Sequence, residues 1–127
     1  MKNFTVNTKA REELVDITPK IEDIARSSGV KEGVLVVFIP HTTAGVVINE
    51  NADPAVKEDI IKGLGIVPKA GYSHAEGNSP AHIKSSLVGQ SVTVLVSGGR
   101  LKLGTWQGIC LAEFDGPRQR TVWVKVI

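Results

Sequence analysis

The chain has one cysteine, little net charge and no long apolar run, and each of these shortages argues against a class of protein. Only one of its 127 residues is a cysteine, Cys110, so no internal disulfide can form, which fits a reducing cytoplasm. Lys and Arg number 15 against 13 Asp and Glu, and a net charge of +2 is too small to indicate binding to nucleic acid or to a membrane. No apolar run is long enough to cross a bilayer, and the segment after Met1 lacks the apolar stretch of a signal peptide. We therefore expect a cytoplasmic protein.

The chain does have enough apolar residues for one well-packed domain spanning residues 1–127, with 42% hydrophobic residues. Each of three pairs, Thr18-Pro19, Asp53-Pro54 and Ser79-Pro80, places a capping residue before a proline and predicts the start of a short helix. Alternating or wholly apolar segments predict about seven strands, at residues 2–8, 13–17, 33–39, 44–48, 91–97, 105–114 and 118–127. The fold class is therefore α+β, with two or three short helices.

Two finer predictions concern the second half of the chain. Asp115-Gly116-Pro117 separates the last two strands and is typical of a turn, so we expect those strands to form a hairpin. In the helix predicted to begin at Ser79, Ile83 and Leu87 have the spacing of a face that packs on the core. The thiol of Cys110 lies between two apolar residues and is expected to be a small buried side chain.

The only three histidines, His41, His74 and His82, each lie in a short polar motif near the end of a predicted element. Three neutral imidazoles with one open position are a common ligand set for catalytic zinc, so a divalent metal, zinc first, is one hypothesis. The chain lacks the Pro-Cys-x-x-Cys motif of zinc deaminases, and no two histidines have the zincin spacing of four. A site shared by His41 and His82, with His74 as a third member, is the prediction.

His41 is followed by Thr42 and Thr43, whose hydroxyls suit a phosphate or a carboxylate, although threonine is also common in strands. At the other end of the next strand lies the polar run Asn49-Glu50-Asn51-Ala52-Asp53. Asp53 is explained as a helix cap, whereas Asn49 and Glu50 are either a solvated turn or part of the site. Glu50 and Asp59 are candidates for a general base or for activation of a water, and Asn49 for substrate binding.

Anion donors are predicted at two further places. The start of the helix at Asn78-Ser79 has free backbone N–H groups and the positive end of a helix dipole. Arg118 and Arg120 are two residues apart on one face of the last strand, where they either clamp a phosphate or extend into solvent.

These segments together resemble the YjbQ-like family, described as a secondary thiamine-phosphate synthase family. The resemblance extends over nearly the whole chain, and it rests on His41-Thr42-Thr43-Ala44, residues 49–54 with Asp59, 76–78, 82–84, 99–101, Gly104-Thr105-Trp106-Gln107, and residues 113–118 with Arg120. It implies a compact α+β sandwich that assembles as a homotrimer, with a polar, metal-binding site near the subunit boundaries. Strands that carry Val and Ile on both faces also favour a homotrimer, because one small domain cannot cover them all.

Three functions remain open. The activity that the resemblance implies is a weak joining of hydroxymethylpyrimidine diphosphate to a thiazole phosphate, with release of pyrophosphate. The second is metal-dependent hydrolysis of a small phosphorylated metabolite, with Glu50 or Asp59 activating water. The third is a non-catalytic trimeric module that binds a small anion. Turnover of the two thiamine precursors would separate the first from the others.

Overall fold

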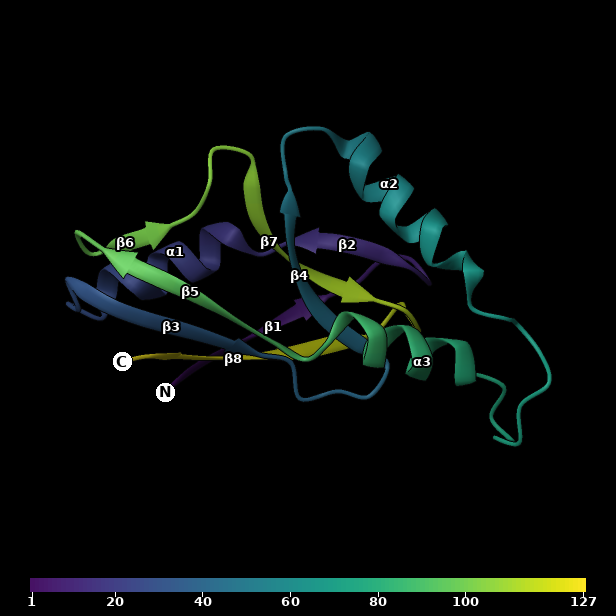
Figure 1. Ribbon diagram of the computed structural model, residues 1–127. Helices are drawn as coiled ribbons and strands as arrows, with labels where there is room; N and C mark the ends of the chain where they lie inside the picture. Colours follow the sequence, from purple (N-terminus) through teal and green to yellow (C-terminus); the bar gives the residue numbers. More distant parts are fainter.

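Two antiparallel sheets enclose the main hydrophobic core of the protein, a computed structural model of which describes residues 1–127 (Figure 1). The strand order is β1-β8-β3-β5-β6 in the five-stranded sheet and β2-β7-β4 in the three-stranded sheet. The strands are β1 (Lys2–Asn7), β2 (Glu13–Asp16), β3 (Glu32–Phe38), β4 (Ala44–Glu50), β5 (Ser91–Ser97), β6 (Arg100–Lys102), β7 (Gln107–Glu113) and β8 (Gln119–Val126). The α+β class and the seven expected strands are confirmed, and the short β6 is an addition.

The core forms because alternate residues of the central strands face inward. Leu35 and Val37 of β3 and Val122 of β8 meet Ile109 and Leu111 of β7, and all five side chains are fully buried. Helix α1 (Thr18–Ser27) closes one end of this core with Ile21 and Ala25. Burying side chains of this kind contributes about 1.5–3 kcal/mol each, so the core fixes the sheets that carry the site.

A second, smaller cluster holds the other two helices against the outer face of the three-stranded sheet. Ala112 of β7 and Phe114 pack with Ala81 of α3 (Ser79–Val88), and Ile61 of α2 (Pro54–Gly63) joins them. The 3-10 turn η1 (Leu64–Ile66) follows α2 directly. Segment 67–78 then leads to α3 without regular structure, at the right of Figure 1. This segment and α3 bring polar residues beside the start of β4.

The three helices begin at the predicted Pro pairs, but only one cap is the predicted one. Asp53 caps α2, with its carboxylate accepting a hydrogen bond from the Ala55 N–H at 2.9 Å. Thr18 and Ser79 are instead the first helical residues of α1 and α3. The Thr18 hydroxyl accepts from the Ile109 N–H at 2.8 Å, so its role is to fix α1 to β7.

The predicted hairpin between the last two strands is wrong, because β7 and β8 belong to different sheets. The connecting residues cross from one sheet to the other, and the Gly116-Pro117 peptide bond is cis. Gly116 lies so close to the carbonyl of Ala10 that a side chain would not fit, and its N–H donates to the Arg11 carbonyl at 2.9 Å. The crossing therefore leaves Glu113 and Arg120 facing each other between the sheets rather than paired across a hairpin.

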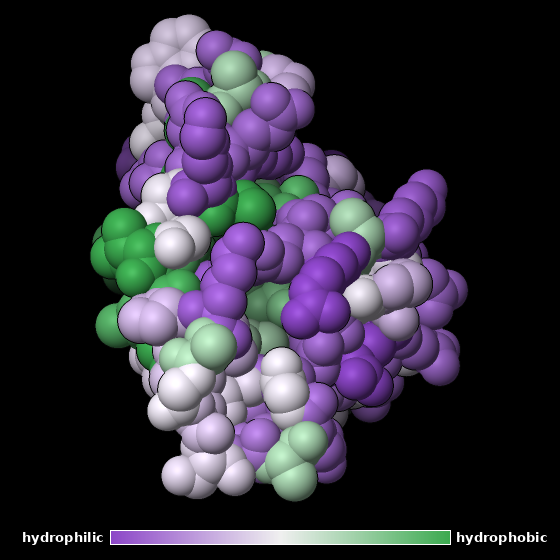
Figure 2. Space-filling model, turned by 90° about the vertical axis from the view of Figure 1, so that its right-hand side faces the viewer, coloured by the Kyte–Doolittle hydropathy of each residue, from purple (hydrophilic) through white to green (hydrophobic).

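A second correction concerns the surface. Leu87, which we expected in the core, is 64% exposed, because α3 turns Ala81 and Ser85 toward the sheet instead. Leu95 and Ile66 are also exposed, and Figure 2 shows apolar surface along one flank and beneath the hydrophilic upper part of that view. Cys110 is buried as expected, and burial raises the pKa of its thiol to about 11. No helix has the length and apolar character needed to cross a membrane.

Candidate functional site

A polar cavity of about 460 Å³ opens where the connection from β3 to β4, the start of α3 and the crossing from β7 to β8 meet. None of its eleven lining residues is an aliphatic or aromatic hydrophobic one. They are Pro40, His41, Thr42, Thr43, His74, Glu76, Asn78, His82, Asp115, Arg118 and Arg120. Segments that are far apart in sequence thus supply one continuous polar wall.

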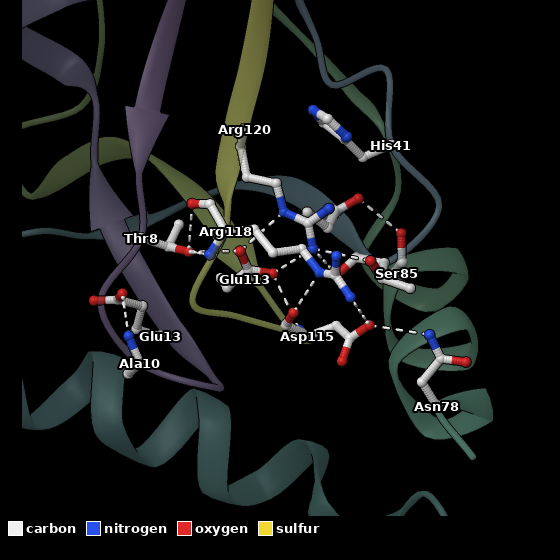
Figure 3. A network of polar contacts seen from close by, with 12 residues as sticks. Thr8, Ala10, Glu13, His41, Asn78, Ser85, Glu113, Asp115, Arg118 and Arg120 are labelled. Atoms are coloured by element: carbon white, nitrogen blue, oxygen red, sulfur yellow. Dashed lines mark hydrogen bonds and ion pairs between the residues drawn. The ribbon is translucent and has the colours of Figure 1, made fainter. Parts of the chain in front are cut away.

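The floor of the cavity is a buried ion pair between Arg120 and Glu113 (Figure 3). The guanidinium donates through Nε to Glu113 Oε1 at 2.9 Å and through Nη2 to Glu113 Oε2, to the Thr43 hydroxyl at 2.9 Å and to the Thr43 carbonyl at 3.1 Å. Glu113 also accepts from the Thr8 hydroxyl at 2.7 Å and from the Asp115 N–H at 3.0 Å. Burial alone would raise the pKa of Glu113, but these bonds outweigh it and hold that pKa below its ordinary value.

Arg118 forms a second, more exposed pair with Asp115 at the rim. Its Nη2 donates to Asp115 Oδ2 at 3.1 Å and its Nε to the Asp115 carbonyl at 2.7 Å. Asn78 Nδ2 donates to the same Oδ2 at 3.0 Å, which ties the start of α3 to the crossing. Burial raises the pKa of Asp115, but the bonds from Asn78 and Arg118 outweigh this and lower it overall, so the carboxylate stays ionised.

His41 is held in one protonation state. Its Nε2 accepts a hydrogen bond from the Thr121 N–H at 2.8 Å, so in the neutral ring the proton is on Nδ1. Burial, and then the positive charge of Arg120, lower the pKa of His41, against the weaker effect of Glu113. His41 is therefore a neutral donor through Nδ1, and Nε2 is not free to bind a metal unless the Thr121 bond is broken.

His74 and His82 lie together in the lining of the cavity. Their ring centroids are 5.4 Å apart and the rings meet edge to face. Glu76 Oε2 is 3.8 Å from His74 Nε2. No group of three His, Cys, Asp or Glu side chains converges tightly enough to hold a metal ion within one chain. The predicted three-histidine ligand set is thus split between a pair, His74 and His82, and a separately held His41.

Comparison with known proteins gives the family of this chain. The family described as UPF0047 protein YjbQ-like matches residues 2–127. The chain is 57% identical over 126 residues to the UPF0047 protein MJ1081 of Methanocaldococcus jannaschii, which covers 98% of this chain and 91% of that protein. It is 46% identical over 130 residues to the UPF0047 protein YugU of Bacillus subtilis, which covers 100% of this chain and 98% of that protein.

The chain belongs to the YjbQ family. The crystal structure of a YjbQ/UPF0047 family protein from Clostridium acetobutylicum matches its fold with a TM-score of 0.97 and 51% identity over 100% of both chains. A conserved hypothetical protein from Thermus thermophilus matches with a TM-score of 0.91 and 42% identity, again over 100% of both chains. The names of these relatives state no activity, so the function of this YjbQ-family chain is argued below from its own site.

The structure brings most of the predicted site residues together. His41, Thr42, Thr43, His74, Asn78, His82, Arg118 and Arg120 all line the cavity. Ser79 begins α3 but does not line it, and its neighbour Pro80 has no N–H. The next two N–H groups, of Ala81 and His82, already donate to the Asn78 carbonyl. The start of α3 therefore offers fewer open donors to an anion than the sequence indicated.

Besides Ser79, three predicted residues lie outside the cavity. Asn49 and Glu50 are at the far end of β4 from Thr43, and six residues of an antiparallel strand span roughly 20 Å. Asp59, a candidate for activating water, is exposed on α2, whose inward-facing residues are only half-buried. Within one chain, none of the three contacts the histidines or the arginines.

Sequence reasoning did not select Glu76, Glu113 or Asp115, although all three shape the site. Glu113 ends an otherwise apolar strand, and a carboxylate at a position that alternation places in the interior needs a cationic partner. That partner is Arg120, three residues past the predicted turn, and the expected hairpin concealed the pairing. Asp115 was assigned to the turn alone.

Proposed function

We propose that this protein is an enzyme acting on a small phosphorylated metabolite and that the polar cavity is its active site. One observation carries the proposal: two arginines and three histidines converge on a cavity that has no hydrophobic lining. Such a wall suits a highly charged ligand, since ordinary small-molecule pockets are mostly apolar. Residues from distant parts of the chain would not gather in this way for a solvated surface.

Two groups are placed to bind phosphate. The side chain of Arg118 is 53% exposed, so it can turn from Asp115 toward a ligand and make charge-assisted hydrogen bonds. Arg120 has only Nη1 without a protein partner, because Nε and Nη2 are bonded to Glu113 and Thr43. Arg118 is thus the main phosphate ligand in the proposal, and Arg120 contributes one donor from the floor.

The net charge of the cavity shows what else the binding of phosphate requires. Arg118 and Arg120 face three carboxylates, those of Glu113, Asp115 and Glu76, so the site carries one net negative charge when its histidines are neutral. Binding of a phosphate dianion therefore needs added positive charge beside Arg118. A divalent metal would supply it, but within one chain no three His, Cys, Asp or Glu side chains converge to hold a metal ion, so the proposal gives the metal no chemical step.

Of the reactions considered, transfer with release of pyrophosphate is the one we test first, because the family resemblance implies it. The bond from the pyrimidine methylene carbon to the diphosphate oxygen would break, and a bond from that carbon to the thiazole nitrogen would form. Arg118 would stabilise the leaving pyrophosphate, and His82, which lines the same cavity, would donate a proton to it. Hydrolysis is the alternative, and it would need a histidine as base because Glu50 and Asp59 lie elsewhere in the chain.

The binding test is a calorimetric titration of pyrophosphate, with and without Zn²⁺, into the wild type and the variant Arg118→Gln. Losing a charge-assisted bond costs about 1.5–3 kcal/mol, so we expect affinity to fall by at least tenfold. Arg100→Gln is a matched control, since Arg100 is also exposed and paired with a carboxylate, Glu22, but lies on β6. Equal affinity in the two variants would contradict the assignment of Arg118.

The catalytic test is incubation with hydroxymethylpyrimidine diphosphate and thiazole phosphate, followed by measurement of pyrophosphate release. We expect turnover that is lost in His82→Ala and retained in Arg100→Gln. Binding without turnover of these precursors or of simple phosphate esters would support the anion-binding module instead.

We also propose that the protein is a homotrimer. Leu95 and Leu87 are 60% and 64% exposed, and Phe38 and Trp123 stack on the outer face of the five-stranded sheet with ring centroids 5.8 Å apart. Exposed apolar surface of this kind is typical of an interaction surface. Light scattering at micromolar concentration should give three times the mass of the chain, 13.6 kDa, and a stable monomer would rule the trimer out.

A further inference from the structure

The cavity contains more hydrogen-bond acceptors than a phosphate can use. Asp115 accepts both of its side-chain hydrogen bonds at Oδ2, which leaves Oδ1 without a protein partner. Asn78 Oδ1 also has no partner, but it is buried and faces away from Asp115, so a ligand in the cavity does not reach it (Figure 3). An acceptor left without a donor costs free energy, and a ligand that donates to Asp115 Oδ1 would offset this cost. The phosphate of a fully ionised monoester cannot provide that donor, because its oxygens only accept.

Two further side chains extend the same pattern. Glu76 lines the cavity with its carboxylate largely exposed, and its negative charge repels phosphate. Thr42 is exposed at the rim, and its hydroxyl, able to donate and accept, makes no hydrogen bond with the protein. The wall thus offers carboxylates and a hydroxyl beside the arginine that binds phosphate. Hydroxyl groups on a ligand can satisfy all of them.

The same wall is a poor match for a flat heteroaromatic ring such as the pyrimidine or thiazole of the transfer reaction, so this inference favours the alternative reaction, hydrolysis. Such rings are usually held by apolar or aromatic side chains. Of the residues that line this cavity, only the histidines and Pro40 could pack against a ring. A ligand without hydroxyls would leave Oδ1 of Asp115 unpaired. A site built to bond hydroxyls rejects analogues that lack them more strongly than an apolar pocket rejects an added hydroxyl.

We propose that the metabolite bound here is polyhydroxylated, a sugar phosphate or polyol phosphate, with its phosphate at Arg118 and its hydroxyls at Asp115, Glu76 and Thr42. This inference rests on the proposed function, because it assumes that the cavity binds phosphate. It narrows the substrate class from any phosphorylated metabolite to one whose carbon skeleton carries several hydroxyl groups.

The test compares three probes by calorimetry: inorganic phosphate, ribose 5-phosphate and phenyl phosphate. We expect ribose 5-phosphate to bind at least about tenfold more tightly than phenyl phosphate, because only the sugar satisfies the free acceptors. The double variant Glu76→Ala with Thr42→Val should remove most of that advantage without weakening inorganic phosphate. Glu58→Ala, a change at an exposed glutamate of α2, should leave all three affinities unchanged.

The outcomes separate this inference from the proposed function. If phenyl phosphate binds as tightly as ribose 5-phosphate and Arg118→Gln weakens both, the phosphate site stands and the sugar class is wrong. If the double variant leaves the preference for ribose 5-phosphate intact, the assignment of Glu76 and Thr42 to the hydroxyls is wrong. If none of the three probes binds, both the proposed function and this inference are overturned.

Discussion

Two arginine–carboxylate pairs stand side by side in the cavity, and they differ almost only in burial. In the inner pair, the side chains of Arg120 and Glu113 are 4% and 0% exposed, whereas in the rim pair those of Arg118 and Asp115 are 53% and 12% exposed. The residue types and charges are closely matched. The buried pair, Arg120 with Glu113, therefore stabilises the fold, whereas the more exposed pair, Arg118 with Asp115, is available to a ligand.

The physical basis of that difference is competition with water. Removing a buried charge from its partner is costly, because nothing else solvates it, and Glu113 is also fixed by Thr8 and the Asp115 N–H. Exposed pairs exchange partners with solvent at little cost, and their net contribution to stability is about 0–1 kcal/mol. Sequence alone presents Arg118 and Arg120 as equivalent, but the structure shows them to be different.

The largest expected effect breaks the inner pair. Glu113→Gln leaves Arg120 buried without a counter-charge, and breaking a buried pair in this way costs about 3–5 kcal/mol. Urea unfolding followed by circular dichroism should show this loss in the free energy of unfolding. The matched amide change at the rim, Asp115→Asn, is the control. A cost of Glu113→Gln no larger than that of the control would contradict the contrast between the two pairs.

A smaller loss of stability is expected when Glu113 of the inner pair is protonated at low pH instead of being replaced. The pKa of Glu113 is held below its ordinary value of 4.5, so the folded protein binds this proton less readily than the unfolded chain. The stability from the ionised carboxylate is complete above about pH 4.5 and is lost as the pH falls through the folded-state pKa. The difference in unfolding free energy between wild type and Glu113→Gln should therefore be full at pH 7 and shrink below pH 4. A difference that is the same at pH 7 and pH 3 would mean that Glu113 is not ionised in the fold.

These two pairs also show how far the sequence could lead. Local signals were enough for the strands, for the Pro-marked helix starts and for a polar site containing His41, His82 and the arginines. They failed at residues 114–118, where the decision between a hairpin and a crossing depends on the packing of Gly116 against Ala10, a contact between distant segments. The partner of Arg120 was missed for the same reason.

Glu50 and Asn49 were predicted as site residues for a different reason, and they lie outside the cavity. Both follow an apolar strand and are polar, as are the residues that do line the cavity, so composition could not tell the two ends of β4 apart. Only the antiparallel register, which pairs Glu50 with Gln107 and Ala44 with Glu113, places them at opposite ends of the domain. The local sequence pattern identified the kinds of residue in the site, but the pairing of strands that are distant in sequence determines which of these residues lie together.

The smallest stability effect is expected at the rim, together with a gain in anion binding. Asp115→Asn keeps acceptors for Asn78 and Arg118, so unfolding should change by less than about 1 kcal/mol. Removing the negative charge beside Arg118 frees it for phosphate, and one charge at contact distance near a surface is worth roughly 1 kcal/mol or more, so pyrophosphate should bind about fivefold more tightly.

The control for the rim is Asp23→Asn, since Asp23 pairs with Arg26 at the same sequence separation of three but on α1, away from the cavity. It should change neither stability nor pyrophosphate affinity appreciably. If Asp115→Asn weakens pyrophosphate while Asp23→Asn does not, Asp115 positions Arg118 for the ligand rather than competing with the ligand for it. Arg118 and Asp115 would then be a fixed part of the fold, as Arg120 and Glu113 are. Their greater exposure would not make them available to a ligand.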